Sequence, residues 1–505
     1  MTTQPSSDSY LDLDLDGALA AVMRECYLDE VPDVIRYKDY PALWEERKQE
    51  LLARLTSGEY RPHAASIVEV PKGTLVSRPI AVMDLTDRVL YEAIMDKIGP
   101  LVDSELTEEV RSARLYKKKS GRYAQPKQTK AWARFQRDGR KMCDLYEHVC
   151  MLTTDITSYF EFIDLDILIA ELRQVPGVAK ELVDLLARLL HGLSKYGDLN
   201  GIPQGPAVSS LLGNFYLRPL DAILRKLDVK FLRFQDDIKV FAEEPHLLRR
   251  AVHSLTPVVR GRHLNLSTAK TKILTGDAVR EHFEDAHKDA IQYGMEIGAE
   301  EIGQELRELF DDAVKGDVRE RDVKFAVNRL SKLDDPHAIP WILENLSSVP
   351  YLSAILVRYL SEHFSDHPEI ESQVCSFLSD ERVNIDPFVE IQLIRMLASA
   401  DHLVTTTYDL LWKTLMHPAK DTRVRQFAAR AIGHHIRDGR TADIELLRGF
   451  VGREAGQSEL QRAILVSLYA ADATDKGYLD GVASAYPALR AVCRYLRSNP
   501  SLPPP

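Results

Sequence analysis

"FLRFQDDIKVF", residues 231–241, places two adjacent carboxylates, Asp236 and Asp237, inside an otherwise apolar run. Burying a charged side chain is costly unless it is paired or coordinates a metal ion. The flanks on both sides are rich in Phe, Leu, Ile and Val, which favour strands. The segment is therefore predicted to form two short strands with both aspartates at the turn between them.

The composition of the chain is that of an ordinary globular protein. Its 505 residues are 45% hydrophobic and 28% charged, which allows two to four domains with well-filled cores. It contains no run of 18 apolar residues, and its N-terminus lacks the basic-then-apolar order of a signal peptide. The five cysteines are scattered and form no CxxC pair. We therefore expect a cytoplasmic protein with reduced thiols, no zinc site and no membrane partner.

The charge is distributed unevenly along the chain. Residues 111–141 hold twelve Lys or Arg and a single acid, Asp138, although the whole chain has a net charge of -11. Residues 281–505 carry that negative excess, with about 11 more acids than bases. The basic stretch also contains interleaved aromatic residues, and this combination suits a nucleic-acid backbone with unstacked bases. We predict that residues 111–141 contact nucleic acid.

Hydrophobic patterning divides the chain into three parts. Residues 1–58 are predicted to form a helical N-terminal segment. Residues 59–285 alternate strand and helix signals, as an α+β domain does. Residues 286–505 contain one amphipathic helix after another, broken by recurring Asp-Pro and His-Pro pairs. Helix pairs at this spacing favour an all-α domain of HEAT-like repeats, although a helical bundle without repeats remains the alternative.

Three segments together could carry phosphoryl-transfer chemistry. "LTTDITSYFEFIDLDIL", residues 152–168, puts Asp155 at the end of an apolar strand. "NGIPQGPAVSSLLGNFYLRPLD", residues 200–221, lies between it and the Asp236-Asp237 hairpin. Transfer to a 3'-hydroxyl uses two divalent ions, and hard ions prefer carboxylate oxygens. Asp155 and the aspartate pair would supply that set.

These segments resemble the reverse transcriptase family. "DITSYFEFID" is similar to the first palm motif, the Pro-Gln-Gly segment to the second, and "FQDD" to the family's Tyr-x-Asp-Asp. "LNLSTAKTKIL", residues 264–274, resembles the Lys-Thr motif, and "PKGTLVSRPIAVMDLTDRVL", residues 71–90, resembles the preceding fingers motif. The order and spacing agree over about residues 60–275. The resemblance implies an α+β fingers-palm domain, followed here by the helical domain.

The resemblance also implies roles for individual residues. Asp155, Asp236 and Asp237 would be the catalytic residues and would bind Mg²⁺ or Mn²⁺. Phe160 would act as a steric gate against the sugar 2' position, favouring dNTPs. The remaining contacts to the incoming dNTP would come from Lys72, Arg78, Gln204, Gly205 and Lys270. Phe234 replaces the usual Tyr and removes a hydroxyl near the primer terminus.

A fingers-palm unit followed by a HEAT-like domain resembles the bacterial abortive-infection and defence-associated reverse transcriptases. That group implies a DNA polymerase acting against phage, often as a homo-oligomer, in some members protein-primed and untemplated, with a single-stranded DNA product. The alternative is a retron-type or intron-type enzyme that copies a bound noncoding RNA. A third interpretation is a non-catalytic nucleic-acid-binding scaffold, which the intact aspartate set disfavours. The sequence leaves the template, the primer, the trigger and the oligomer size open.

Overall fold

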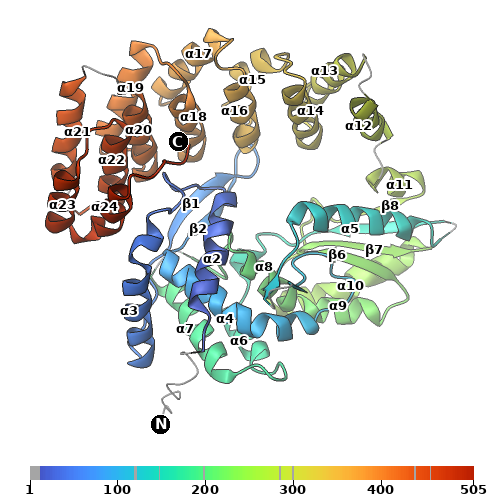
Figure 1. Cartoon of the computed structure of the whole chain (residues 1–505). Coiled ribbons are helices and arrows are strands. Elements are labelled where there is room, and N and C mark those ends of the chain that lie inside the picture. Colours follow the sequence, from blue (N-terminus) through green and yellow to red (C-terminus); the bar gives the residue numbers. More distant parts are fainter. Residues whose placement is uncertain are drawn as a thin grey trace. The chain divides into compact units, whose positions relative to one another are not determined.

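The computed structural model describes residues 12–118, 122–146, 148–196, 199–283, 286–297, 301–436, 440–454 and 456–504. Within these residues the chain forms two compact units (Figure 1). The first contains the chain up to Glu30, Arg47–Val68 and Pro79–Asp289. The second contains Val31–Glu46, Glu69–Arg78 and the chain from Ala290 onward.

A four-stranded antiparallel sheet forms the centre of the first unit. Its strands are β5 (Cys150–Thr154), β6 (Lys230–Phe234), β7 (Asp237–Ala242) and β8 (Lys272–Thr275), in the order β6-β7-β5-β8. Every residue of β5 is buried, which explains its nearly continuous apolar sequence. Two further two-stranded sheets are β1 (Ser66–Pro71) with β2 (Ser77–Val82), and β3 (Tyr116–Lys117) with β4 (Tyr123–Ala124).

Helices cover the sheet because both of its faces are apolar. One face packs against α5 (Gln128–Cys143) and α11 (Asp277–Phe283), in a core that includes Met151, Phe234 and Phe241. Helix α10 (Pro245–Gly261) also contacts three of the strands. The other helices of this unit are α2 (Leu15–Glu25), α4 (Leu85–Ser104), α6 (Leu165–Leu172), α7 (Lys180–Tyr196), α8 (Ala207–Tyr216), α9 (Arg218–Arg225) and most of α3 (Trp44–Thr56).

The second unit is helical in its described part from Ala290 onward. Its helices after α12 (Ala286–Ile297) are α13 (Ile302–Ala313), α14 (Glu320–Lys332), α15 (Ile339–Asn345), α16 (Ser353–Glu362), α17 (Pro368–Ser379), α18 (Pro387–Ser399), α19 (Thr405–Met416), α20 (Thr422–His435), α21 (Thr441–Arg453), α22 (Ser458–Ala470), α23 (Lys476–Ala485) and α24 (Arg490–Arg497).

These helices stack in two rows along the chain. Contacts join α14 to α16, α18, α20, α22 and α24 in succession, and α15 to α17 and α19 in a second row. Successive packing of helix pairs is the arrangement that builds a helical solenoid. The α+β domain followed by an all-α domain is therefore confirmed. The HEAT-like identity of the repeats stays a prediction.

A short N-terminal segment is part of the helical unit, which the sequence patterning did not indicate. Val34 and Ile35 are buried in the same apolar core as the repeat helices. The Arg462 guanidinium on α22 donates to the carboxylates of Asp33 and Asp39 at 2.6–3.0 Å. All three side chains are largely buried, so each buried charge has an opposite partner. Segment Val31–Glu46 is thus tied to α22 by both apolar and ionic contacts.

The close approach of α20 and α22 gives a test of the stacked helices. A Cβ atom added at Gly433 would lie 2.5 Å from the Ser467 Cα and carbonyl oxygen, so the backbones must separate. We expect Gly433→Ala to lower the free energy of unfolding by about 1–3 kcal/mol, measured by urea denaturation of the full chain.

Gly449→Ala is the matched control for this variant. Gly449 lies on α21 and its added Cβ would meet no atom within 4 Å. This substitution should instead stabilise the chain by about 0.5–1 kcal/mol, because alanine favours helix more than glycine. Equal stability of the two variants would contradict the tight α20–α22 packing.

Candidate active site

The pairing of β5 with β7 places Asp155 beside Asp237. The antiparallel register aligns Thr153 with Lys239 and Thr154 with Ile238, so its next step aligns Asp155 with Asp237. Alternate residues of a strand point to the same face. Lys239 confirms this geometry, because its ammonium group donates to Thr153 Oγ1 at 2.6 Å and lies 2.8 Å from an Asp237 oxygen. The side chains of Asp155 and Asp237 therefore leave the same face at the same end of the sheet.

Asp236 completes a group of three carboxylates. It occupies the two-residue turn Gln235-Asp236 between β6 and β7, as the sequence predicted, whereas Asp237 is already the first residue of β7. Burial, the charge of Asp155 and a hydrogen bond to Asp155 raise the pKa of Asp236 to about 7. Burial also raises the pKa of Asp237, although the neighbouring Lys239 partly offsets it. Crowded carboxylates of this kind disfavour their own ionisation unless a cation joins them.

Two lysines contribute positive charge to the group. Lys239 is buried between Thr153 and Asp237. Lys270 forms an ion pair with Asp155 from the loop that precedes β8. That loop is held by a bond from the Ser267 amide to the Asp155 carbonyl, at 2.7 Å. Burial opposes the charge of Lys270, but the hydrogen bond to Asp155 and the three carboxylates raise its pKa. Lys270 therefore lies beside the three carboxylates, and its role toward a nucleotide stays a prediction.

A buried ion pair supports the hairpin on the side of helices α8 and α9. The guanidinium of Arg233 is fully buried and donates to both carboxylate oxygens of Asp221, at 2.8 and 2.6 Å. It also donates to the side-chain oxygen of Asn214 at 2.8 Å and to the Gln235 carbonyl at 3.1 Å. Breaking a buried pair by removing one partner typically costs about 3–5 kcal/mol. Arg233 thus joins the catalytic turn to helices α8 and α9.

The turn itself has a strained backbone that is held by hydrogen bonds. Gln235 adopts a φ of 57°, a left-handed conformation that is uncommon for residues other than glycine. Its amide donates to Ser112 Oγ at 2.7 Å, and its side-chain amide donates to the Ser210 carbonyl at 3.2 Å. Asn214 donates to the Ser112 carbonyl at 2.8 Å. These contacts fix the direction in which Asp236 leaves the turn.

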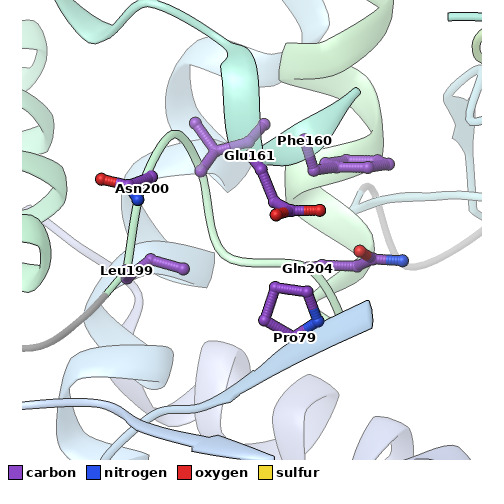
Figure 2. Close-up of a pocket in the computed structure, with 7 residues that line it drawn as sticks. Pro79, Phe160, Glu161, Leu199, Asn200 and Gln204 are labelled. Carbon is purple, nitrogen blue, oxygen red and sulfur yellow. The ribbon is translucent and has the colours of Figure 1, made fainter. Parts of the chain in front are cut away.

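Phe160 lines a small pocket together with residues of the Pro-Gln-Gly loop. It lies in a single 3-10 turn, Phe160–Phe162, shortly after Asp155. The pocket is lined by Pro79, Phe160, Glu161, Leu199, Asn200, Ile202 and Gln204. Figure 2 shows the Phe160 ring and the Gln204 amide extending toward the same side. Phe160 and Gln204, which come from two different motifs, therefore line one pocket, and their contact with a nucleotide stays a prediction.

The Pro-Gln-Gly loop approaches Phe160 closely enough to require glycine. Gly201 has a φ of 67°, and a Cβ atom there would lie 2.0 Å from the Phe160 carbonyl oxygen. The Ile202 amide donates to that same carbonyl at 3.1 Å. Gly205, just before α8, is exposed and has a φ of 130°. The loop thus places Gln204 beside Phe160 and leaves the backbone of Gly205 open to solvent.

Lys72 and Arg78 occur in a different part of the structure. Both belong to the β1–β2 hairpin, where Lys72 is exposed and Arg78 half-buried. Their segment, Glu69–Arg78, belongs to the second compact unit, whereas the three aspartates belong to the first. Their role toward a nucleotide stays a prediction.

The three aspartates are suited to a hard divalent cation by their chemistry. Oxygen donors are what Mg²⁺ and Mn²⁺ prefer, and a bound cation would counteract the burial and the neighbouring negative charge that raise the pKa values of Asp236 and Asp237. In the described part of the chain, the tightest group of possible ligands is elsewhere. His63, Asp84 and Asp87 have ligand atoms that all lie within 4.8 Å of one another.

Hydrogen bonds within the protein already engage the His63 group. The two Asp87 oxygens accept from Tyr60 Oη at 2.8 Å and from the His63 amide at 2.7 Å. Asp84 caps α4 by accepting from the Thr86 amide at 2.8 Å. We therefore assign the His63 group a structural role, and the catalytic role of the three aspartates stays a prediction.

Sequence reasoning missed the supporting residues. Asn214 and Asp221 lie inside the quoted motif of residues 200–221, yet no role followed from their identity alone. Glu161 and Asn200 line the pocket because the Pro-Gln-Gly loop approaches Phe160. No local sequence pattern indicates that approach. One signal was available: Arg233 lies between apolar residues of a predicted strand, and a buried arginine needs a carboxylate partner that its neighbours in the sequence do not supply.

The comparisons with known proteins identify the domain that contains these residues. Residues 70–310 match the family model for reverse transcriptase (RNA-dependent DNA polymerase). No curated protein matches the chain. Among solved structures, telomerase from Candida albicans with a fragment of telomeric RNA has a TM-score of 0.32 and 11% identity, over 73% of this chain and 70% of that one. Apo telomerase from Candida tropicalis gives 0.32 and 11%, over 77% and 74%. These two scores are too low to support any argument.

The family match and the helices of the structure each add one feature. The region 70–310 is a reverse transcriptase domain, so the chain carries the catalytic domain of an RNA-directed DNA polymerase. In the described residues, no helix is long and apolar enough to cross a membrane.

The crowding of the carboxylates predicts a stability change that depends on pH. Asp236 has a pKa of about 7 in the folded chain against an ordinary 3.8. The folded state therefore binds the extra proton, and stability falls as pH rises from about 4 to 7. In EDTA, Asp236→Asn should raise the melting temperature by about 2–4 °C at pH 8 and leave it unchanged at pH 4. A lower melting temperature at pH 8 would contradict the crowding.

Proposed function

We propose that this chain, through the reverse transcriptase domain of residues 70–310, adds dNTPs to a 3'-hydroxyl by two-metal phosphoryl transfer. The observation that carries the proposal is the meeting of Asp155, Asp236 and Asp237 at one end of the sheet. When bound there, two divalent ions would activate the attacking hydroxyl and stabilise the leaving pyrophosphate. The carboxylates would hold the ions, and the Arg233–Asp221 pair would keep the turn in place.

The remaining side chains are assigned to the incoming nucleotide. Phe160 blocks the volume that a ribose 2'-hydroxyl would need, and Gln204 and Gly205 lie along the nucleotide beside it. Lys270, paired with Asp155, lies where its ammonium group could neutralise the departing pyrophosphate. The family resemblance assigns Lys72 and Arg78 to the triphosphate, where an arginine can form bidentate contacts.

We also propose that the enzyme acts in antiphage defence of the abortive-infection type. The support is the architecture, in which an all-α domain with a net charge of about -11 follows the polymerase domain. A negative surface would hold a nucleic-acid duplex poorly, so its partner is expected to be protein, and we propose another copy of the same chain. Synthesis would then start from a protein hydroxyl, without a template. Among the described tyrosines, Tyr27, Tyr116 and Tyr123 are the most exposed, so they are the first to examine.

The test of polymerase function compares the wild-type enzyme with Asp236→Ala. Purified protein is incubated with labelled dNTPs and Mg²⁺, with and without added RNA template and primer. The wild-type should incorporate dNTPs without either addition. The incorporation rate of Asp236→Ala should be lower by at least about a thousandfold, because a two-metal site loses one of its ligands. Circular dichroism confirms that the variant is folded.

The same reaction separates the alternatives. Protease digestion should leave a peptide on the DNA 5' end if synthesis is protein-primed, and native mass should exceed that of one chain. Incorporation only with RNA template and primer would favour the retron-type or intron-type alternative. Unchanged incorporation by Asp236→Ala would refute the site, and a wild-type protein that binds nucleic acid without incorporation would favour the scaffold.

Sugar discrimination tests the role of Phe160. Replacing the ring with a methyl group in Phe160→Ala opens the pocket beside Gln204. We expect the ratio of kcat/KM for dNTP over rNTP to fall by at least about tenfold, chiefly through faster rNTP use, since a lost steric clash of about 1.4 kcal/mol gives that factor. Leu199→Ala, at the same pocket, serves as the control and should leave the ratio unchanged. An equal ratio in Phe160→Ala and wild-type would remove the gate assignment.

A further inference from the structure

Helix α5 presents a regular row of positive charges to solvent. Lys127 at the N-cap is followed on the same side by Lys130, Arg134, Arg137 and Lys141. All five are exposed, and the spacings of three and four residues place them on one face. The opposite face carries the buried residues Ala131, Phe135, Gly139 and Cys143. At 1.5 Å per residue, the row extends for about 21 Å with a cation about every 5 Å.

Helix stability does not explain this row. Surface helices commonly pair their lysines with acids, as Lys324 does with Glu320 at 2.6 Å on α14. Helix α5 has no acid in its first turn, where the helix dipole favours negative charge, and instead begins with Lys127 and Lys130. Its single acid, Asp138, is half-buried and paired with Arg111 at 2.7 Å, and it also lies 3.7 Å from the Arg134 guanidinium and 3.9 Å from that of Arg137, so one carboxylate faces the five cations of the row. The row is therefore a local electrostatic cost, which an anionic ligand would offset.

The buried side of α5 ties the helix to the catalytic hairpin. The Trp132 ring lies edge-on to Phe234, with centroids 5.1 Å apart, and Phe135 lies 5.5 Å from the same ring. Phe234 is the strand partner of Asp237. Phe241 belongs to the same core and shares its strand face with Asp237 and Lys239. Helix α5 thus packs on the sheet face from which Asp155 and Asp237 extend.

We propose that α5 is a phosphate-binding rail that holds a nucleic-acid strand at a fixed distance from the catalytic carboxylates. The ligand chemistry is the phosphodiester backbone of single-stranded DNA or RNA, recognised by charge and without regard to base sequence. This inference rests on the proposed function, because the ligand assigned to the row of cations is the nucleic-acid strand on which the polymerase would act. A strand bound along five cations would be positioned by a helix that cannot move without displacing Phe234.

The experiment measures binding without catalysis. A fluorescent oligothymidylate or oligouridylate of about 20 nucleotides is titrated with full-length protein, without divalent cation or dNTP, over a range of salt concentrations. The triple variant Lys130→Gln, Arg134→Gln, Arg137→Gln should lower the slope of log K against log salt by about 2, because each single-strand phosphate contact contributes about 0.7. Its affinity at low salt should fall by more than about tenfold. The DNA and RNA arms show which strand the rail prefers.

The matched control removes the same charge from another helix. Arg249, Arg250 and Arg260 are exposed on α10 of the same unit, and their triple change to Gln should leave the slope unchanged. Melting curves confirm that both variants fold. Any of three results would overturn the proposal. The α5 variant could keep the wild-type slope, the α10 control could lose as much of the slope as the α5 variant, or the wild-type protein could bind polyglutamate as tightly as the oligonucleotide. Because metal and dNTP are absent, failure of the polymerase assignment would not alter this result.

Discussion

The register between β5 and β7 is the constraint on which the site depends. Aligning Thr154 with Ile238 brings Asp155 opposite Asp237 and puts Lys239 within bonding distance of both Thr153 and Asp237. A slip of one residue would turn every side chain of β7 to the other face of the sheet. It would bury Asp237 among the apolar residues that now surround Ile238 and separate the carboxylates. The full burial of β5 and the apolar core on both sides of the sheet therefore specify the chemistry as well as the fold.

Opposite charges inside the protein hold this arrangement where it would otherwise come apart. Burial, together with the charge of Asp155, raises the pKa values of both Asp236 and Asp237. The buried Arg233–Asp221 pair fixes the turn from the side away from solvent, and the Asn214 and Ser112 bonds hold its left-handed residue. Strain of this kind persists at functional sites when the surrounding contacts determine it completely. The structure thus holds an unfavourable cluster of acids in one place.

Much of this could be predicted from the sequence, for identifiable reasons. The Asp236-Asp237 pair in an apolar run and Asp155 after an apolar strand are local signals, and local signals predicted the hairpin and the helical second part. The family resemblance, and no local signal, placed Phe160 and Gln204 near the same nucleotide. Contacts between distant segments carry no such signal. Asp33 and Asp39 meet Arg462 more than 400 positions away, and no pattern near either end indicates it. The partner of Arg233 was equally hidden, since its carboxylate lies in another helix.

The central claim is that Asp155, Asp236 and Asp237 form a two-metal site, and anomalous diffraction from crystals soaked in Mn²⁺ with a non-hydrolysable dNTP tests it most directly. Two anomalous peaks about 3.5–4 Å apart, both in contact with these three carboxylates, are the predicted result. A single peak at His63, Asp84 and Asp87, with none at the aspartates, would contradict the account.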